Sequence, residues 1–190
     1  EELSKPVERL ELNLFGYNSK LPDPDAIGIM LHKQTALLDL SMFLFLNGRA
    51  VYNGITEAIS SLTKLKKFNL WILEHCNLAD ESSAVLEAVF KLPSIEAVRL
   101  DYLSVFEMNS IRKFLVALRK AKNLHTLYFS ASLGACTDQE IEDLIEFIQT
   151  RERSQIKNLL ITPQDGDILE PEVINRLEQA LNKYSRSEER

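Results

Sequence analysis

The sequence is poor in the residues that mark several classes of protein. Only two of its 190 residues are cysteines, Cys76 and Cys136, which excludes a disulfide framework and a four-cysteine zinc site. Six glycines and six prolines are too few for a linker-rich or low-complexity chain. Acidic residues outnumber basic ones by 28 to 22, and a net charge of −6 is not the footprint of a nucleic-acid-binding protein.

Long hydrophobic runs are also missing. No segment reaches the ~18 uncharged apolar residues that a membrane-spanning helix requires, and the best candidate, residues 35–47, is interrupted by Asp39. The first six residues lack the basic start and apolar stretch of a secretory signal. Two free cysteines fit a reducing compartment. We therefore expect no membrane insertion and a cytoplasmic location, or the host-cell cytosol if the chain is a secreted effector.

The spacings that carry catalytic or metal chemistry do not occur. His32, His75 and His125 form no His-x-x-x-His pair and there is no Cys-x-x-Cys, so no metal site is expected. Glycine-rich nucleotide loops are absent as well. The neighbours His75 and Cys76 do not by themselves make a base and a nucleophile. We expect no catalytic residue, no cofactor and no small-molecule substrate.

The sequence does contain a repeat. Six segments share the pattern apolar-x-x-apolar-x-apolar, in which the last three positions alternate as they do in a strand with one buried face. Thr35, at the start of the second segment, is the one polar residue among the pattern positions. The middle residues of the six segments are Leu10, Leu38, Phe68, Val98, Leu127 and Leu159, about 28 to 32 residues apart, a period typical of solenoids.

Between these segments, apolar residues recur at helical spacing. The capping-box sequence from Thr137 to Glu140 marks the start of one predicted helix, and Pro171 suits the first turn of the last one. The stripes are Ile27/Leu31, Tyr52/Ile55/Ile59, Leu86/Val89/Phe90, Ile111/Phe114/Leu115/Leu118, Ile141/Leu144/Ile145/Ile148 and Ile174/Leu177/Leu181.

A strand and a helix in each repeat can bury their apolar faces only against neighbouring repeats. This predicts an α/β fold: a right-handed solenoid over residues 1–184, with six parallel strands on a concave wall and helices on the convex wall. A polar tail, residues 185–190, follows. A doubly wound sheet also alternates strands and helices, but it does not require the same apolar positions in every strand.

The pattern resembles the leucine-rich repeat family, and within it the ribonuclease-inhibitor-like class. Cys76-Asn77-Leu78, followed by Leu86, Phe90 and the strand that ends at Leu100, looks like that class's turn, helix and next strand. The resemblance implies a horseshoe-shaped arc that recognises proteins through its concave sheet. The family's turn Asn or Cys is replaced by Phe15, Phe43, Leu73, Leu103, Ser132 and Gln164, which predicts irregular turns.

Residues that alternate with the apolar positions should point to the concave face and form rows across neighbouring strands. One row is expected to hold Asn13, Ser41, Trp71, Asp101, Ser130 and Thr162, with Glu11, Asp39, Asn69, Arg99, Tyr128 and Leu160 in the next; Leu37 is placed on the same face. Trp, Arg and Tyr are enriched at binding hot spots. We therefore predict a partner-binding patch made of Trp71, Arg99, Tyr128, Asp101, Asn69 and Asp39.

Alternatives remain open at this point. Trp71 can simply pack under a turn, and Arg99 can simply pair with Asp101 or Asp39. The basic predicted helix around Arg112 can dock an acidic partner or pair with acids of the next helix. The chain is interpreted as a non-enzymatic scaffold or adaptor that binds a protein. The competing hypothesis is a targeting or substrate-recognition domain of a larger ubiquitin ligase or kinase, or of a secreted bacterial effector.

Overall fold

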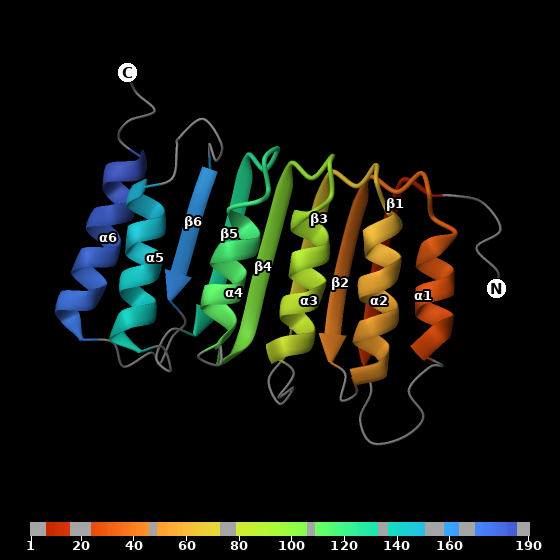
Figure 1. Ribbon diagram of the computed structural model, residues 1–190, viewed down its shortest axis with the longest axis horizontal. Helices are drawn as coiled ribbons and strands as arrows, with labels where there is room; N and C mark the ends of the chain where they lie inside the picture. Colours follow the sequence, from red (N-terminus) through yellow and green to blue (C-terminus); the bar gives the residue numbers. More distant parts are fainter. Residues whose placement is uncertain are drawn as a thin grey trace.

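The computed structural model describes residues 7–15, 24–45, 49–72, 79–105, 109–132, 137–150, 158–163 and 170–185. Strands and helices alternate regularly along these residues (Figure 1). The strands are β1 (Arg9–Phe15), β2 (Asp39–Phe45), β3 (Lys67–Ile72), β4 (Ala97–Val105), β5 (Thr126–Ser132) and β6 (Asn158–Pro163). The helices are α1 (Pro24–His32), α2 (Arg49–Ser61), α3 (Ala79–Phe90), α4 (Asn109–Leu118), α5 (Asp138–Thr150) and α6 (Pro171–Ser185).

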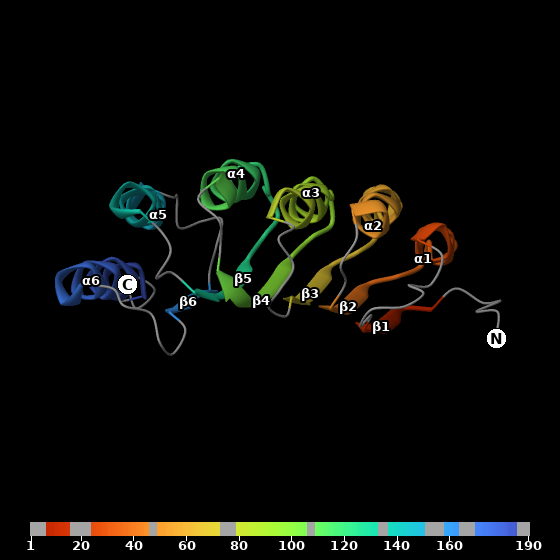
Figure 2. The ribbon, with the colours of Figure 1, turned by 90° about the horizontal axis from the view of Figure 1, so that it is seen from below.

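The strands form one sheet whose order follows the chain from β1 to β6, and every neighbouring pair is parallel. Helices α1 to α5 lie side by side on one face of this sheet, and no described helix covers the opposite face (Figure 2). We call that opposite surface the sheet face. The parallel sheet with helices on one side, expected from the repeat, is confirmed.

The core lies between the sheet and the helix layer. Apolar residues at equivalent strand positions are register partners, so they form continuous buried rows from β2 to β5. Phe114 of α4 lies edge-on to Phe90 of α3, with ring centroids 5.8 Å apart, and stacks on Phe129 of β5 at 4.9 Å. The members of the two rows are Leu40, Phe68, Val98, Leu127 and Met42, Leu70, Leu100, Phe129, each at most 2% exposed.

The second repeat is shifted by two residues from its predicted register. Leu37 was placed on the sheet face, but it is buried and 1% exposed, whereas Thr35 is exposed. Leu37, Leu40 and Met42 thus occupy the positions predicted for Thr35, Leu38 and Leu40. The physical reason is that the position two residues before each of the strands β2 to β5 is buried, and a leucine fills it where a threonine would bury a hydroxyl.

Neighbouring repeats are also joined by a main-chain ladder at the strand entries. In four successive repeats, one carbonyl oxygen accepts hydrogen bonds from two consecutive N–H groups of the next repeat, at 2.8 to 3.1 Å. These bonds use backbone atoms alone, so they do not depend on the side chains at these positions. The acceptors are Glu8, Leu38, Lys66 and Glu96, and the donor pairs are Leu38/Asp39, Lys66/Lys67, Glu96/Ala97 and His125/Thr126.

The two ends of the sheet differ. Helix α6 packs against β6 and α5 near the level of the sheet (Figure 2), where its Leu177 and Ala180 are buried. Arg176 of α6 forms an ion pair with Glu142 of α5. At the other end, Leu12 of β1 is only half-buried, although its register partner Met42 is fully buried. The last helix therefore covers the outer edge of β6, as a cap does.

A buried glutamine completes the packing beside β1. Gln34 is 1% exposed, and its Oε1 accepts a hydrogen bond from the Val7 N–H at 3.0 Å. The equivalent positions of later repeats hold the buried apolar residues Leu62, Leu92 and Ala121. A buried amide is stable here because it satisfies a backbone donor just before the outermost strand.

Helices α1 and α2 are in close backbone contact at Gly28 and Gly54. A Cβ placed on Gly28 would lie 3.0 Å from the carbonyl oxygen of Gly54. Glycine is intrinsically unfavourable inside a helix, by roughly 1 kcal/mol relative to alanine. Gly28 is therefore kept for this close backbone contact rather than for helix formation.

Helix α5 begins with the predicted capping box, which is confirmed. The Glu140 carboxylate accepts hydrogen bonds from the Thr137 N–H and Oγ1, both at 2.9 Å, and the Glu140 N–H donates to Thr137 Oγ1 at 3.4 Å.

No helix in the described segments is long and apolar enough to cross a bilayer. The predictions for His75, Cys76, Cys136, and the turn positions Leu73 and Gln164 fall outside the described residues.

Candidate functional site

The sheet face brings together the residues that the strand pattern placed on it. Arg99 of β4 lies directly between Asn69 of β3 and Tyr128 of β5 in the register. Trp71 of β3 lies beside Asp101 of β4 in the next row. Both rows follow from alternation, because residues two apart on a strand point to the same face. The β6 side chains of Leu160 and Thr162 lie outside the described residues.

Trp71 is stacked on a second aromatic ring. Its ring centroid lies 4.3 Å from that of Phe43 on β2, and the two ring planes differ by 5°. Phe43 and Trp71 are direct register partners, and both are half-buried. Trp71 is therefore held in place by a neighbouring side chain while part of its surface stays in contact with solvent.

Arg99 continues this stack across the sheet. Its guanidinium carbon lies 4.3 Å from the ring centroid of Tyr128 and 5.8 Å from that of Trp71, both within cation–π distance. The side chains of Phe43, Trp71, Arg99 and Tyr128 thus form one series of contacts across strands β2 to β5, which we call the aromatic–arginine ladder. This arrangement joins the three residue types that the sequence predicted to cluster.

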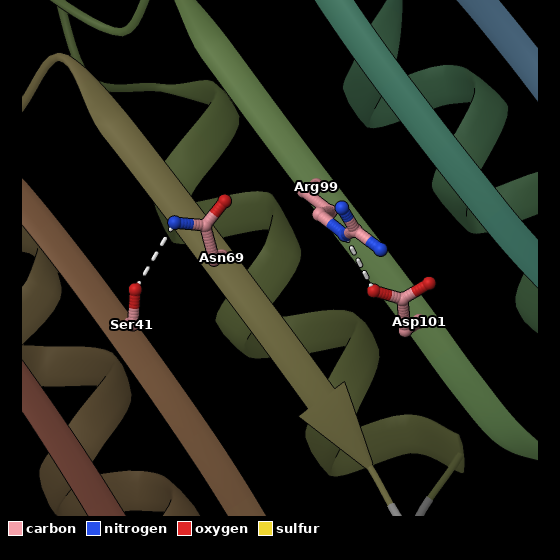
Figure 3. A network of polar contacts seen from close by, with 4 residues as sticks. All are labelled: Ser41, Asn69, Arg99 and Asp101. Carbon is pink, nitrogen blue, oxygen red and sulfur yellow. Dashed lines mark hydrogen bonds and ion pairs between the residues drawn. The ribbon is translucent and has the colours of Figure 1, made fainter.

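Asp101, two residues further along β4, holds the guanidinium in place (Figure 3). The Arg99 Nε donates to Asp101 Oδ2 at 2.7 Å, and the hydrogen bond raises the pKa of Arg99 above its ordinary value. The side chain of Asp101 is only 13% exposed, whereas that of Arg99 is 48% exposed. Of the partners considered from the sequence, Arg99 pairs with Asp101, and it contacts both rings at the same time.

A second polar contact lies beside the ladder. Asn69 Nδ2 donates to Ser41 Oγ at 3.0 Å, from β3 to β2 (Figure 3). Ser41 was predicted in the row of Trp71, but the two-residue shift of the second repeat moves it into the row of Asn69 and Arg99. Polar groups therefore occupy one row, Ser41, Asn69 and Arg99, next to the ring row of Phe43 and Trp71.

The same shift corrects the placement of Asp39. It was predicted to stand beside Asn69 in the patch, but its register partners are Arg9 on β1 and Lys67 on β3, one row closer to the strand entries. The prediction of its row was wrong, and Asp39 is not a contact of the ladder. Its charge instead sits between two cationic side chains on neighbouring strands.

Phe43 is the ladder residue that sequence reasoning missed. The predicted register made it a turn residue, although it lies within β2. The available signal was the triplet Leu37, Leu40 and Met42, whose three positions are all apolar, unlike the triplet that starts at Thr35. Choosing that triplet would have placed Phe43 next to Trp71.

The described residues contain no group of three or more His, Cys, Asp or Glu side chains that could hold a metal ion. On the helix side, Glu142 of α5 pairs with Arg176 of α6. The side chain of Arg112 lies outside the described residues.

Comparison with known proteins supports the fold alone. No family model matches the chain, and no curated protein matches it in sequence. Among solved structures, it is similar to the tropomodulin C-terminal domain of Caenorhabditis elegans, with a TM-score of 0.50 and 14% identity over 87% of this chain and 95% of that one. The fold is thus leucine-rich-repeat-like.

Proposed function

We propose that this chain is a non-enzymatic protein-interaction module, a scaffold or adaptor that grips a protein partner with its sheet face. The parallel repeat supports a right-handed leucine-rich-repeat solenoid of the ribonuclease-inhibitor-like class, in which this face is the concave wall of a horseshoe-shaped arc. The net charge of −6 favours a protein over a nucleic acid as the partner. We expect the interaction to take place in the cytoplasm.

The observation that carries this proposal is the aromatic–arginine ladder. Trp, Tyr and Arg are the residues most enriched at binding hot spots, and here they lie in contact on a surface that no described helix covers. Their contacts with Phe43 and Asp101 hold them in place before binding. A surface ordered in advance loses less conformational entropy when it binds, which favours affinity.

A double variant, Trp71→Ala with Arg99→Ala, tests the proposal. Neither side chain belongs to the buried core, so the variant should remain folded in circular dichroism. A matched control carries Ile29→Ala and Val116→Ala, the two large hydrophobic residues that are most exposed on the helix side, at 56% and 53%. Both variants and the native chain serve as bait for affinity capture.

A protein captured by the native chain and by the helix-side control, but lost with the sheet-face variant, would support the proposal. Calorimetry with that purified protein should then show a loss of ~2 kcal/mol or more in binding free energy, the usual scale of hot-spot truncation. Equal capture by all three baits would place the interaction on another surface and contradict the proposal.

A further inference from the structure

We infer that the sheet face recognises an extended protein segment that carries a carboxylate two residues from a large apolar side chain, and that Arg99 binds the carboxylate. This inference rests on the proposed function and specifies the chemistry of its partner. It follows from the state of the Arg99 guanidinium and from the distance between the polar row and the ring row.

The guanidinium of Arg99 is held in one orientation but keeps N–H donors available for a ligand. Asp101 occupies its Nε, and Tyr128 covers one of its faces. Neither terminal nitrogen has a hydrogen-bond partner among the residues that the structure describes. Two parallel N–H groups on terminal nitrogens match the two oxygens of a carboxylate, so this edge is suited to a bidentate pair.

The charge at this position also favours an anion. An arginine guanidinium is charged throughout the physiological range, and the hydrogen bond to Asp101 raises the pKa of Arg99 further. Asp101 is nearly covered, whereas Arg99 is half-exposed, so an approaching group meets the cation before its counter-ion. The adjacent Asn69 and Ser41 are neutral polar groups, and the acid of the same row, Glu11, lies on β1, three strands away from Arg99.

The second requirement comes from the ring row. Arg99 and Asp101 are two residues apart on β4, and Asp101 is the register partner of Trp71, so the two rows are separated by about 6.6 Å along the strand direction. An extended segment presents side chains i and i+2 on one face at the same separation. A carboxylate seated on Arg99 therefore places the side chain two positions away at the level of the ring row, where Trp71 lies on the neighbouring strand β3 and Phe43 on β2.

The probe for this inference is a displayed library of random linear heptapeptides, selected on the native protein. Enriched peptides should carry Asp or Glu two positions from a large apolar residue. A synthetic enriched peptide should lose about tenfold or more in affinity when its acid is replaced by the matching amide, because a bidentate charge-assisted pair is lost. This comparison does not depend on any protein variant remaining folded.

Protein variants then locate the contact. Arg99→Gln removes the charge, and Arg99→Lys keeps the charge but removes the planar fork. Both variants should therefore bind the acidic peptide more weakly and bind its amide counterpart with unchanged affinity. The intrinsic fluorescence of Trp71, the single tryptophan, reports whether these variants keep the native stack. Trp71→Ala should lower the affinity for both peptides, because each loses the apolar contact.

Each outcome bears on the inference. Peptides that depend on Trp71 but show no preference for an acid would overturn it and leave the proposed function standing. Peptides that bind the double variant Trp71→Ala with Arg99→Ala as well as the native chain would contradict both. Failure to enrich any peptide would overturn the extended-segment recognition, while the capture experiment would still decide whether the sheet face binds folded proteins.

Discussion

Replacing Leu100 by alanine should cost about 3 to 4 kcal/mol of folding free energy. Leu100 is fully buried in β4, and its register partners on both sides, Leu70 and Phe129, are buried too. Removal of three carbon atoms costs about 2.4 kcal/mol in transfer free energy at ~0.8 kcal/mol per buried carbon group. The remaining cost comes from the cavity, because neighbours on both sides leave little room for collapse.

Leu12 provides a matched control, because it occupies the same row on the outermost strand. It has a strand partner on one side only, Met42, and it is half-buried. Leu12→Ala should therefore cost only about 1 kcal/mol, since part of the side chain already contacts water and no closed cavity forms. The difference between the two variants isolates the effect of enclosure by neighbouring repeats.

Urea denaturation followed by circular dichroism measures both costs. A parallel measurement of Trp71 fluorescence reports on β3, and agreement of the two signals shows whether the repeats unfold together, as a single free energy requires. A loss below about 1 kcal/mol for Leu100→Ala, or equal losses for both variants, would refute the assignment of this row to an enclosed core.

Two further predictions concern the helix layer. Gly28→Ala should lower the free energy of unfolding by ~1 kcal/mol, because the clash with the Gly54 carbonyl outweighs the gain in helix propensity. The control Asn53→Ala, on the exposed surface of α2, should not lower it. A higher urea midpoint for Gly28→Ala would contradict the close packing. The hydrogen bond from Lys91 lowers the pKa of Glu87, so the pair stabilises the fold above the ordinary glutamate pKa of about 4.3, and this contribution is lost as the pH falls through the lowered value. Lys91→Met should return the pKa of Glu87 toward its ordinary value in an NMR titration, and an unchanged value would assign the shift to another group.

The repeat could be predicted from the sequence because packing enforces it. Each strand needs apolar residues at the same positions to bury its inner face against the helices, so strands and helices are both visible as apolar periodicities. Leu70, Leu100 and Phe129 were identified as core residues in this way and are buried. The capping position of α6 could not be read from the sequence, since a helical stripe does not reveal which edge of a sheet it covers.

The register of the second repeat could not be read from the sequence as that of the other repeats could, and the reason is geometric. A shift by two residues leaves every side chain within the strand on its original face, because strand residues alternate with a period of two. Asp39 and Ser41 were therefore assigned to the correct face but to the wrong rows. Only the residue before the strand distinguishes the two registers, and there Leu37 is buried while Thr35 is exposed.

The candidate site was predicted in part for this reason. Trp71, Arg99 and Tyr128 come from repeats whose register was read correctly, and they do lie in contact. Phe43 comes from the shifted repeat and was missed. The pairing of Arg99 with Asp101 depends on side-chain torsions, which the sequence pattern does not specify. The role of these residues in binding stays a prediction.

The main-chain ladder at the strand entries has a consequence for how this fold tolerates mutation. Its acceptors are the carbonyl oxygens of two glutamates, a leucine and a lysine, so the hydrogen bonds place no demand on charge, size or polarity. The donor positions demand only an N–H group, which every residue except proline provides. Alanine scanning would pass over these connections, whereas proline at a donor such as Lys67 or Ala97 would remove one of the two main-chain hydrogen bonds that link two adjacent repeats there.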